Sequence, residues 1–211
     1  LLNSEIPIWV NANWGTLNSG VLAQAGPETL HTNFPGATYG NKYFPGALAN
    51  SLSVSDLSPG QPDLNITFGD GINWYYGLDG NTPSGFYDFV TVALHEVSHG
   101  LGFIGSATHN GNSGFTGVAG TPLIYDVFVE TLDGTSILGF NSGTIDLGEA
   151  LESDGLFWNG AEGGASSTIG RPRLYAPANW NGGSSFSHLR ENTYQAGTEN
   201  SLMTPFLGTA E

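Results

Sequence analysis

Residues His95–Phe103 are HEVSHGLGF and form the end of the clearest helical segment in the sequence. Apolar residues of this segment recur at positions i, i+3, i+4, i+7 and i+11, which places them in one stripe along a helix: Val90, Ala93, Leu94, Val97 and Leu101. Gly100 and Gly102 supply a natural stop. The sequence therefore predicts an amphipathic helix that packs through this stripe and ends near Gly102.

The polar side of this helix carries residues suited to metal chemistry. His95 and His99 are four residues apart, so their imidazoles project from one face, opposite the apolar stripe. Such a pair can also be a solvated helix face, but it places two rings within reach of one cation, and neutral imidazole binds zinc at about 2.0–2.1 Å. Glu96 is too close to His95 to share its direction, and can instead take a proton from a water molecule on the metal. The spacing predicts a zinc site with Glu96 as general base.

A catalytic zinc ion needs a third protein ligand. In the short form of the motif a third histidine follows Gly102 by three residues, but that position is Gly105. His109 is a candidate, although its Gly- and Asn-rich surroundings favour a solvated loop. Glu130 would suit the class of zinc peptidases in which a glutamate on a second helix completes the site. The segment Tyr125–Leu132 is too apolar and β-branched to favour that helix.

His188 is the strongest candidate for the third ligand. It is followed fifteen residues later by Met203, the one methionine of the chain, in the segment Ser201–Pro205 (SLMTP). A lone methionine before a proline is more often a core residue at a turn. Together with a histidine shortly upstream and HEVSHGLGF far upstream, this methionine supports His188 as the third ligand.

The order of these motifs resembles that of the metzincin clan of zinc peptidases, and within it the leishmanolysin-like peptidases. The resemblance rests on HEVSHGLGF, a long insertion, His188 and the SLMTP segment. It implies that His95, His99 and His188 bind zinc, that Glu96 is the general base and that Met203 forms a hydrophobic floor beneath the metal. The chain departs from this family, whose members are rich in disulfides, because it has no cysteine. This points to a distant bacterial relative.

The resemblance also implies a fold and a function. The fold is α+β: residues 1–104 form a subdomain with a twisted sheet and the active-site helix, residues 105–211 form a largely irregular subdomain, and a cleft lies between them. The implied function is an endopeptidase that acts on proteins or peptides. We also expect a monomer. The strand Ile72–Leu78 would be the sheet edge along which an extended substrate pairs. Two other interpretations stay open: a zinc peptidase with Glu130 as third ligand, and a non-catalytic zinc-containing binding module.

Composition limits the partners and the cellular compartment. The chain has 19 acidic and 4 basic residues, a formal net charge of −15, which argues against nucleic acid and anionic membranes as partners. No apolar run is long enough to cross a membrane. The absence of cysteine excludes disulfides, thiolate ligands and a cysteine nucleophile. Because the chain begins at Leu1, we expect a secreted protein processed from a longer precursor.

The remaining patterns are local. Acidic turn segments at Asp70-Gly71 and Asp79-Gly80-Asn81 are more often plain turns, but could also bind Ca²⁺. Alternating or continuous apolar residues predict strands at Ile6–Val10, Leu64–Phe68 and Ile72–Leu78. Further expectations are turns at the two FPGA segments (Phe34–Ala37 and Phe44–Ala47), short elements at Tyr125–Leu132 and Thr144–Leu147, and a loop at Gly160–Ser167.

Overall fold

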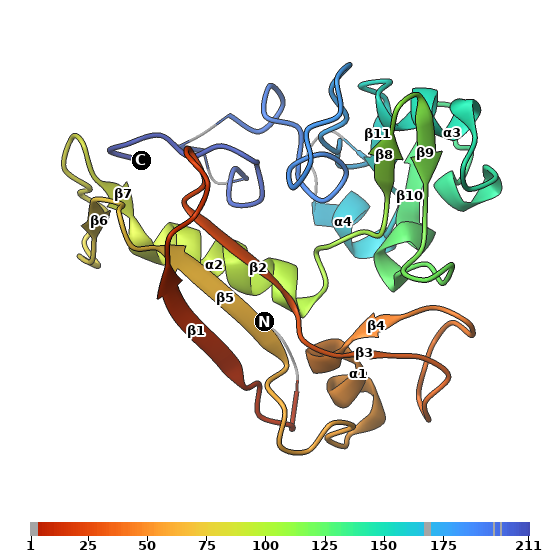
Figure 1. Ribbon diagram of the computed structural model, residues 1–211, viewed down its shortest axis with the longest axis horizontal. Coiled ribbons are helices and arrows are strands. Elements are labelled where there is room, and N and C mark those ends of the chain that lie inside the picture. The colour runs from red at the N-terminus through yellow and green to blue at the C-terminus, as the bar shows by residue number, and fades with distance from the viewer. Residues whose placement is uncertain (1–3, 167–169, 196, 199) are drawn as a thin grey trace.

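The computed structural model describes residues 4–166, 170–195, 197–198 and 200–211. It is a mixed α+β fold of short helices and small sheets, as expected from the sequence (Figure 1). The elements follow in the order β1 (Val10–Gly15), β2 (Ala23–Pro27), β3 (Leu30–His31), β4 (Phe44–Pro45), α1 (Gly46–Ser53), β5 (Leu64–Gly69), β6 (Trp74–Tyr75), β7 (Tyr87–Asp88), α2 (Phe89–Leu101), β8 (Thr108–Asn110), β9 (Ser113–Phe115), η1 (Ile124–Phe128), β10 (Val129–Thr131), η2 (Ile137–Gly139), α3 (Ile145–Leu151), β11 (Leu156–Trp158) and α4 (Ala161–Ser166).

The largest sheet supports helix α2. Its central strand β5 pairs in parallel with β1 and antiparallel with β2. Because side chains alternate along a strand, Leu64, Ile66 and Phe68 all lie on one face, where they are buried against α2. The strand at Leu64–Phe68 predicted from the sequence is thus confirmed. Its buried face is the surface on which α2 packs.

Helix α2 has the predicted extent. The Asp88 side chain accepts a hydrogen bond from the Thr91 backbone N–H at 2.7 Å and caps the N-terminus, while Gly102, with φ of 127°, ends the helix. The predicted apolar stripe is wrong in one position, since Leu94 is 52% exposed, and Val92 and Gly100 are buried instead. The sheet covers a face of the helix that is rotated from the predicted stripe, and periodicity alone does not show which side the sheet covers.

Close packing of α2 on β5 depends on the absence of a side chain at position 100. A Cβ atom added to Gly100 would lie 2.6 Å from the Cβ atom of Leu64, whose side chain is fully buried. The glycine therefore brings the helix backbone onto the sheet directly beside His99. This contact helps to bury His99, which is next to Gly100 in the helix.

The apolar side chains form three clusters. One, around Leu64 and Val92, lies between the main sheet and α2. A second, around Phe44 and Ala49, surrounds α1, and a third, which includes Tyr125, lies among the elements that follow α2. The predicted subdomain boundary between residues 104 and 105 stays a prediction.

Two predicted strands differ from the observed ones. The N-terminal strand begins at Val10, where the Ile6–Val10 prediction ends, because pairing with β5 starts with Val10 opposite Leu64. In Ile72–Leu78 only Trp74–Tyr75 is a strand, and it pairs with Tyr87–Asp88 in a separate small sheet. The Trp74 indole N–H donates to the Gly69 carbonyl at 2.9 Å, which folds this segment back. It is therefore not the edge of the main sheet.

Of the predicted turns and loops, some are observed and others are not. Phe34–Ala37 is a turn, closed by the Ala37 N–H on the Phe34 carbonyl at 3.0 Å. Phe44–Ala47 is not, because Phe44–Pro45 forms β4 and Gly46 opens α1. Within the segment predicted as a loop, Ala161–Ser166 forms α4, and residue 167 lies outside the described residues. Both misses place helix starts directly after Pro or Gly, which were taken as turn signals.

Elements near the other two predictions are short, as expected. Tyr125–Leu132 contains most of η1 and all of β10, and Thr144 caps α3 by accepting a hydrogen bond from the Leu147 N–H.

The contact between Gly100 and Leu64 generates a stability prediction. Gly100→Ala adds a methyl group where no space exists, so we expect the free energy of unfolding to fall by about 1–3 kcal/mol despite the better helix propensity of alanine. Urea unfolding measures this change. Gly71→Ala is the control, since a Cβ atom there meets no atom within 4 Å. An unchanged or raised midpoint for Gly100→Ala would contradict the packing.

Candidate metal centre

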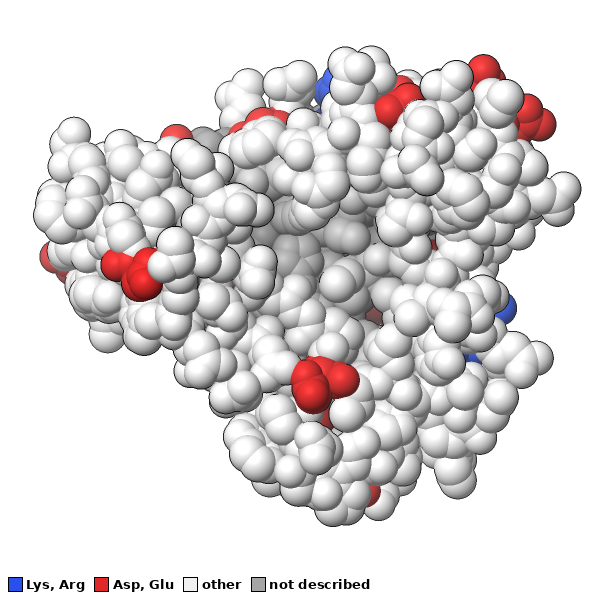
Figure 2. Space-filling view, viewed as in Figure 1, with Lys and Arg blue, Asp and Glu red and all other residues white. Residues whose placement is uncertain are grey.

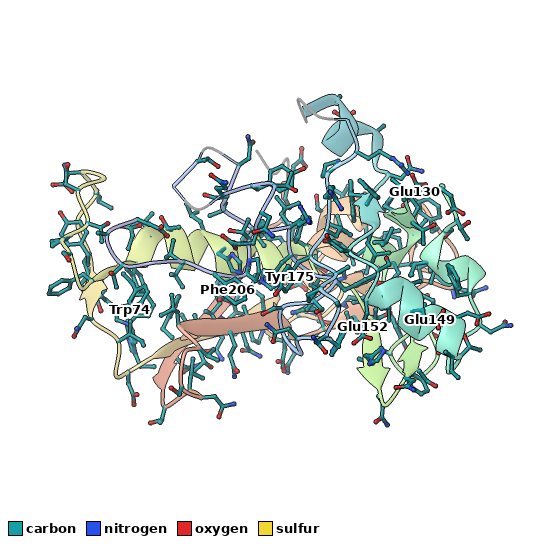
Figure 3. The ribbon with its side chains drawn as sticks, turned by 90° about the horizontal axis from the view of Figure 1, so that it is seen from above. Trp74, Glu130, Glu149, Glu152, Tyr175 and Phe206 are labelled. Carbon is teal, nitrogen blue, oxygen red and sulfur yellow. The ribbon has the colours of Figure 1, made fainter. Side chains whose placement is uncertain are left out.

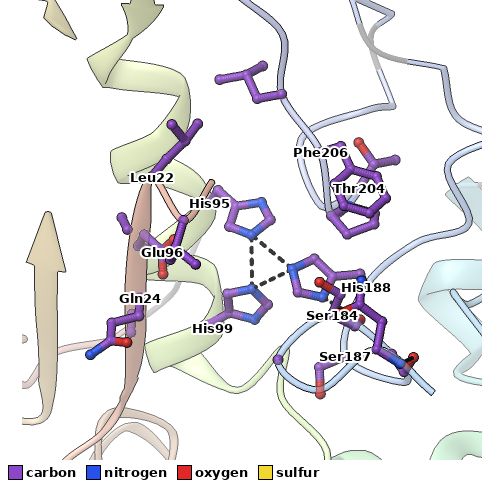
Figure 4. Close-up of a pocket in the computed structure, with 18 of the residues that line it drawn as sticks. Leu22, Gln24, His95, Glu96, His99, Ser184, Ser187, His188, Thr204 and Phe206 are labelled. Carbon is purple, nitrogen blue, oxygen red and sulfur yellow. Dashed lines mark hydrogen bonds between the residues drawn. The ribbon is translucent and has the colours of Figure 1, made fainter. Parts of the chain in front are cut away.

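Three imidazole rings converge on one point in the cleft. The Nε2 atoms of His95 and His99 are 3.0 Å apart, those of His95 and His188 3.1 Å, and those of His99 and His188 3.2 Å (Figure 4). His99 and His188 are buried and His95 is half-buried. Three of the residues predicted from the sequence are therefore brought together, although 89 residues separate the second from the third.

Each ring is oriented by a hydrogen bond on its other nitrogen. The Nδ1 atom of His95 lies 2.6 Å from the Leu202 carbonyl oxygen, and that of His99 2.7 Å from the Phe103 carbonyl oxygen. The Nδ1 atom of His188 lies 2.7 Å from the Ser184 carbonyl oxygen. Because a carbonyl oxygen only accepts, each Nδ1 carries the proton, and each neutral ring presents an unprotonated Nε2.

This arrangement fits a cation. Three nitrogen lone pairs about 3 Å apart repel one another unless a positive charge lies between them. A tetrahedral ion with imidazole ligands at about 2.05 Å would separate the ligand nitrogens by about 3.3 Å, close to the observed distances. Among the described residues, these histidines are the one group of three or more His, Asp or Glu side chains suited to hold a metal ion. Carbonyl partners on the outer nitrogens are typical of metal-binding histidines.

The surroundings keep the three rings neutral. Burial lowers the pKa of His99 to about 4 and that of His188 to about 2, and it also lowers the pKa of His95. The positive charge of neighbouring rings adds to this effect at His99 and His188. Neutral imidazole is the form that binds a metal, so the fold holds these residues in their ligand state near pH 7.

Glu96 lies beside the histidines in the wall of the same cleft (Figure 4). It is 5% exposed, and burial raises the pKa of its carboxyl group to about 7. Within the described part of the chain, no group donates a hydrogen bond to this carboxylate. Its oxygens are not among the fully buried unpartnered atoms, so the carboxylate opens onto the cleft and is available for chemistry.

The segment that carries His188 fills the place where the short motif would have its third histidine. A Cβ atom at Gly105 would lie 2.1 Å from the ring of Phe186, which is buried. The Gly105 N–H donates to the Ser187 hydroxyl at 3.0 Å. Position 105 therefore lacks room for any side chain, and the ligand comes instead from two residues beyond the phenylalanine.

Backbone bonds hold this segment in place. The Phe186 N–H donates to the Tyr175 carbonyl at 2.7 Å, and the Tyr175 N–H donates to the His188 carbonyl at 2.8 Å. The Tyr125 hydroxyl donates to the Phe186 carbonyl at 2.9 Å. Phe186 has a φ of 74°, a left-handed conformation that costs about 1–2 kcal/mol in a non-glycine residue and persists because its ring is locked in the core.

A turn at Ser201–Thr204 reaches the same centre. It is closed by the Thr204 N–H on the Ser201 carbonyl at 3.0 Å, and it contains Met203, which is buried. The Met203 carbonyl accepts from the N–H of Leu189, next to His188, at 2.8 Å. The turn thus contacts His95 through the Leu202 carbonyl and the residue next to His188 through the Met203 carbonyl. The role of the Met203 side chain as a floor stays a prediction.

The cleft around the centre has a volume of about 790 Å³. Figure 4 shows Gln24 on strand β2 and Leu22 just before it along one wall, with Ser184, Ser187, Thr204 and Phe206 on the opposite side. In the space-filling view the middle of the molecule is hollowed, and few Lys or Arg atoms are visible (Figure 2). The wall formed by β2 was not predicted, because its sequence, AQAGP, has no strand periodicity.

Two other third-ligand candidates lie elsewhere. Glu130 is on β10, at a distance from α2 (Figure 3), where it pairs with Arg171 and accepts from the Asn159 amide at 2.6 Å. His109 is on β8, stacked on Trp180 with ring centroids 6.0 Å apart. Its side chain is 7% exposed, so it is not the solvated loop residue that its sequence context suggested. Neither residue is brought to the histidine pair.

The structure gives the Ca²⁺ expectation no support. Asp79 accepts hydrogen bonds from the Tyr75 hydroxyl at 2.7 Å and from the Asn81 N–H at 3.1 Å, and Asp70 accepts from the Thr16 hydroxyl. Among the described residues, no acidic cluster suited to a metal ion occurs. These segments are turns.

Comparison with known proteins gives one match. A family model described as SPBPB7E8-like matches residues 40–163, more than half of the chain. The chain belongs to the SPBPB7E8-like family. The SPBPB7E8-like match contains His95, Glu96 and His99 and ends before His188. No curated protein matches the chain, and no solved structure does.

The structure also bears on membrane insertion. No helix in the described part of this SPBPB7E8-like chain has both the length and the hydropathy needed to cross a bilayer.

The neutral, buried histidines generate a prediction for the metal-free protein. An unfolded histidine titrates near 6.5, while folded His99 and His188 titrate near 4 and 2. Below pH 6.5 these histidines bind protons in the unfolded chain but stay neutral in the folded protein. The free energy of unfolding therefore falls as the pH falls. Glu96 acts in the opposite sense, because its folded pKa is raised to about 7.

Comparison with His188→Gln isolates one ring from the other titrating groups. In a chelator, we expect the free energy of unfolding of the wild type minus that of the variant to fall between pH 7.5 and 5. Below pH 6.5 the slope approaches about 1.4 kcal/mol per pH unit. Urea unfolding at a series of pH values measures this. A difference that does not change with pH would contradict the buried neutral state of His188.

Proposed function

We propose that the protein is a zinc-dependent endopeptidase. The observation that carries the proposal is the set of three Nε2 atoms within 3.0–3.2 Å of one another, beside a buried carboxylate in an open cleft. Three histidines with a free fourth position are the ligand set of a catalytic rather than a structural zinc ion. Zinc, when bound, acts as a Lewis acid on the scissile carbonyl and lowers the pKa of water.

Glu96 acts as the proton carrier in this proposal. Its carboxylate takes a proton from the attacking water and later gives it to the nitrogen of the leaving amine. A carboxyl group with a pKa near 7 is suited to both steps at neutral pH, because it is neither too weak a base nor too weak an acid. Its lack of a hydrogen-bond partner leaves both oxygens free for that exchange.

Strand β2 is proposed as the edge that binds the substrate main chain. It pairs with β5 on one side, and its residues 23–25, with Leu22 just before them, line the cleft on the other. An extended peptide laid along this edge would form main-chain hydrogen bonds and cross the histidine centre. The edge predicted from the sequence, Ile72–Leu78, is thus replaced by a strand that precedes it by some fifty residues.

The metzincin-like arrangement is part of the proposal. It is supported by the order of the parts: a sheet with an antiparallel edge strand, a helix with two histidines, a third histidine on a distant loop, and a turn with a buried methionine. The glutamate-ligand alternative is not favoured, because Glu130 is held by Arg171 and Asn159. Secretion, processing from a precursor, a bacterial source and a monomeric state remain proposals that rest on the sequence.

Metal content tests the ligand set. We expect the wild type to bind one zinc ion per chain and His188→Ala to lose at least about 100-fold in zinc affinity, since a three-nitrogen site becomes a two-nitrogen site. Competition with a chromogenic chelator measures this. His31→Ala is the matched control, because His31 lies on β3 and contacts Ser58. Equal zinc affinity in wild type and His188→Ala would remove His188 from the site.

Proteolysis tests the role of Glu96. We expect Glu96→Gln to retain one zinc ion and to lose at least about 1,000-fold in kcat on a protein substrate, because the amide has nearly the same shape but cannot accept the proton. A non-catalytic binding module would instead show zinc binding and no chelator-sensitive cleavage by the wild type. Undiminished cleavage by a clean Glu96→Gln preparation would refute the mechanism.

A further inference from the structure

The cleft differs from the rest of the molecule in its charge. The chain has 23 charged residues, of which 19 are acidic. Among the described residues that line the cleft, Glu96 is the one acidic side chain, and none is Lys or Arg. In Figure 2 most of the red and blue atoms lie on the surface around the hollow. Side chains that enter this cleft meet no fixed charge except at its centre.

Neutral polar groups form the walls instead. Ser184 and Ser187 lie on the side of the cleft opposite β2 (Figure 4), and Asn181 is also among the lining residues, whereas the Gln24 side chain points away from the histidines. Thr204 adds a hydroxyl from the turn that follows. Amides and hydroxyls of this kind can bond to neutral polar side chains, and the apolar lining residues can pack against aliphatic ones.

A charged substrate side chain would lose water here without gaining a partner. Removing a charge from water is costly unless an opposite charge or several hydrogen bonds replace the hydration shell. Glu96 is 5% exposed beside the histidines, where the proposed reaction uses it, so it does not serve a basic side chain elsewhere in the cleft. The penalty therefore applies to acidic and basic side chains alike.

We propose that the cleft selects uncharged segments of its substrates, so that the residues on both sides of the cleaved bond carry neutral side chains. This rests on the proposed endopeptidase function and adds the substrate class to it. The opposing explanation for any charge preference is the field of the whole protein. With a formal net charge of −15, that field would repel acidic peptides and attract basic ones.

Matched peptide pairs separate these explanations. Fluorogenic peptides differ at one residue next to the cleaved bond, either Asn against Asp or norleucine against Lys. We expect kcat/KM at least about 10-fold lower for both charged peptides, and we expect both penalties to persist in about 0.5 M NaCl, since desolvation is not screened. A penalty for Asp alone that vanishes in salt would overturn the proposal in favour of the field. Equal cleavage of charged and neutral peptides would also overturn it.

Isosteric variants test whether the walls carry the preference. Asn181→Asp places one carboxylate in the wall and should improve cleavage of Lys peptides relative to norleucine peptides by about 10-fold. Asn141→Asp is the control, because Asn141 is exposed and outside the lining of the cleft, yet the variant changes net charge equally. The same gain in Asn141→Asp, or no gain in Asn181→Asp, would count against the proposal.

Failure of the underlying function has a different signature. If the protein is not a zinc endopeptidase, none of the peptides is cleaved, or cleavage persists in a chelator and in Glu96→Gln. If only the specificity proposal is wrong, cleavage stops in the chelator and in Glu96→Gln, and charged peptides are cleaved as well as neutral ones.

Discussion

The candidate site depends on the hydrogen bond that each of its three histidines makes through Nδ1 to a backbone carbonyl. A free imidazole has two tautomers and rotates about its side-chain bonds. Bonds of 2.6–2.7 Å to the carbonyls of Leu202, Phe103 and Ser184 remove both freedoms. Three unprotonated nitrogens are then forced to face one another. The carbonyls come from three separate parts of the chain, so the site exists only when all three are folded together.

The absence of a side chain at Gly105 is related to the long chain between the second and third histidines. Phe186 occupies the space beside Gly105, and its backbone is held by Tyr175 and Tyr125. For that ring to arrive there, the intervening segment must form a core of its own. It does so around side chains such as Leu147 and Leu151, which are fully buried. The entropy cost of closing a longer loop grows slowly with its length, and the apolar burial within this segment offsets that cost.

Local patterns predicted the parts of this site that depend on local geometry. The helix, its stop at Gly102 and the shared face of His95 and His99 follow from periodicity over a few residues, and all agree with the structure. His188 was found only because the SLMTP segment follows it, a clue that lies outside any local periodicity. Strand β2 was missed, since its role arises from pairing with β5, some forty residues later, and leaves no alternation in its own sequence.

The errors of prediction share this cause. Ile72–Leu78 has the composition of a strand, but the Trp74 indole bonds to Gly69 and turns the segment away from the sheet. Leu94 has the spacing of a core residue, but it lies on a side of α2 that the sheet does not cover. In both cases the residue pattern is sound and the missing information is the position of a distant element. Single-sequence periodicity does not contain that position.

The balance of costs within the cleft favours an enzyme over a structural zinc module. Three facing lone pairs destabilise the metal-free fold, and a bound cation would relieve that cost in either case. Glu96 would remain a second cost, since burial disfavours its charged form, and a module that only held a metal would be more stable with an apolar residue there. Sites that keep such a desolvated carboxyl group are expected where chemistry requires it. The carboxylate is therefore the residue that separates the two interpretations, more than the three histidines beside it.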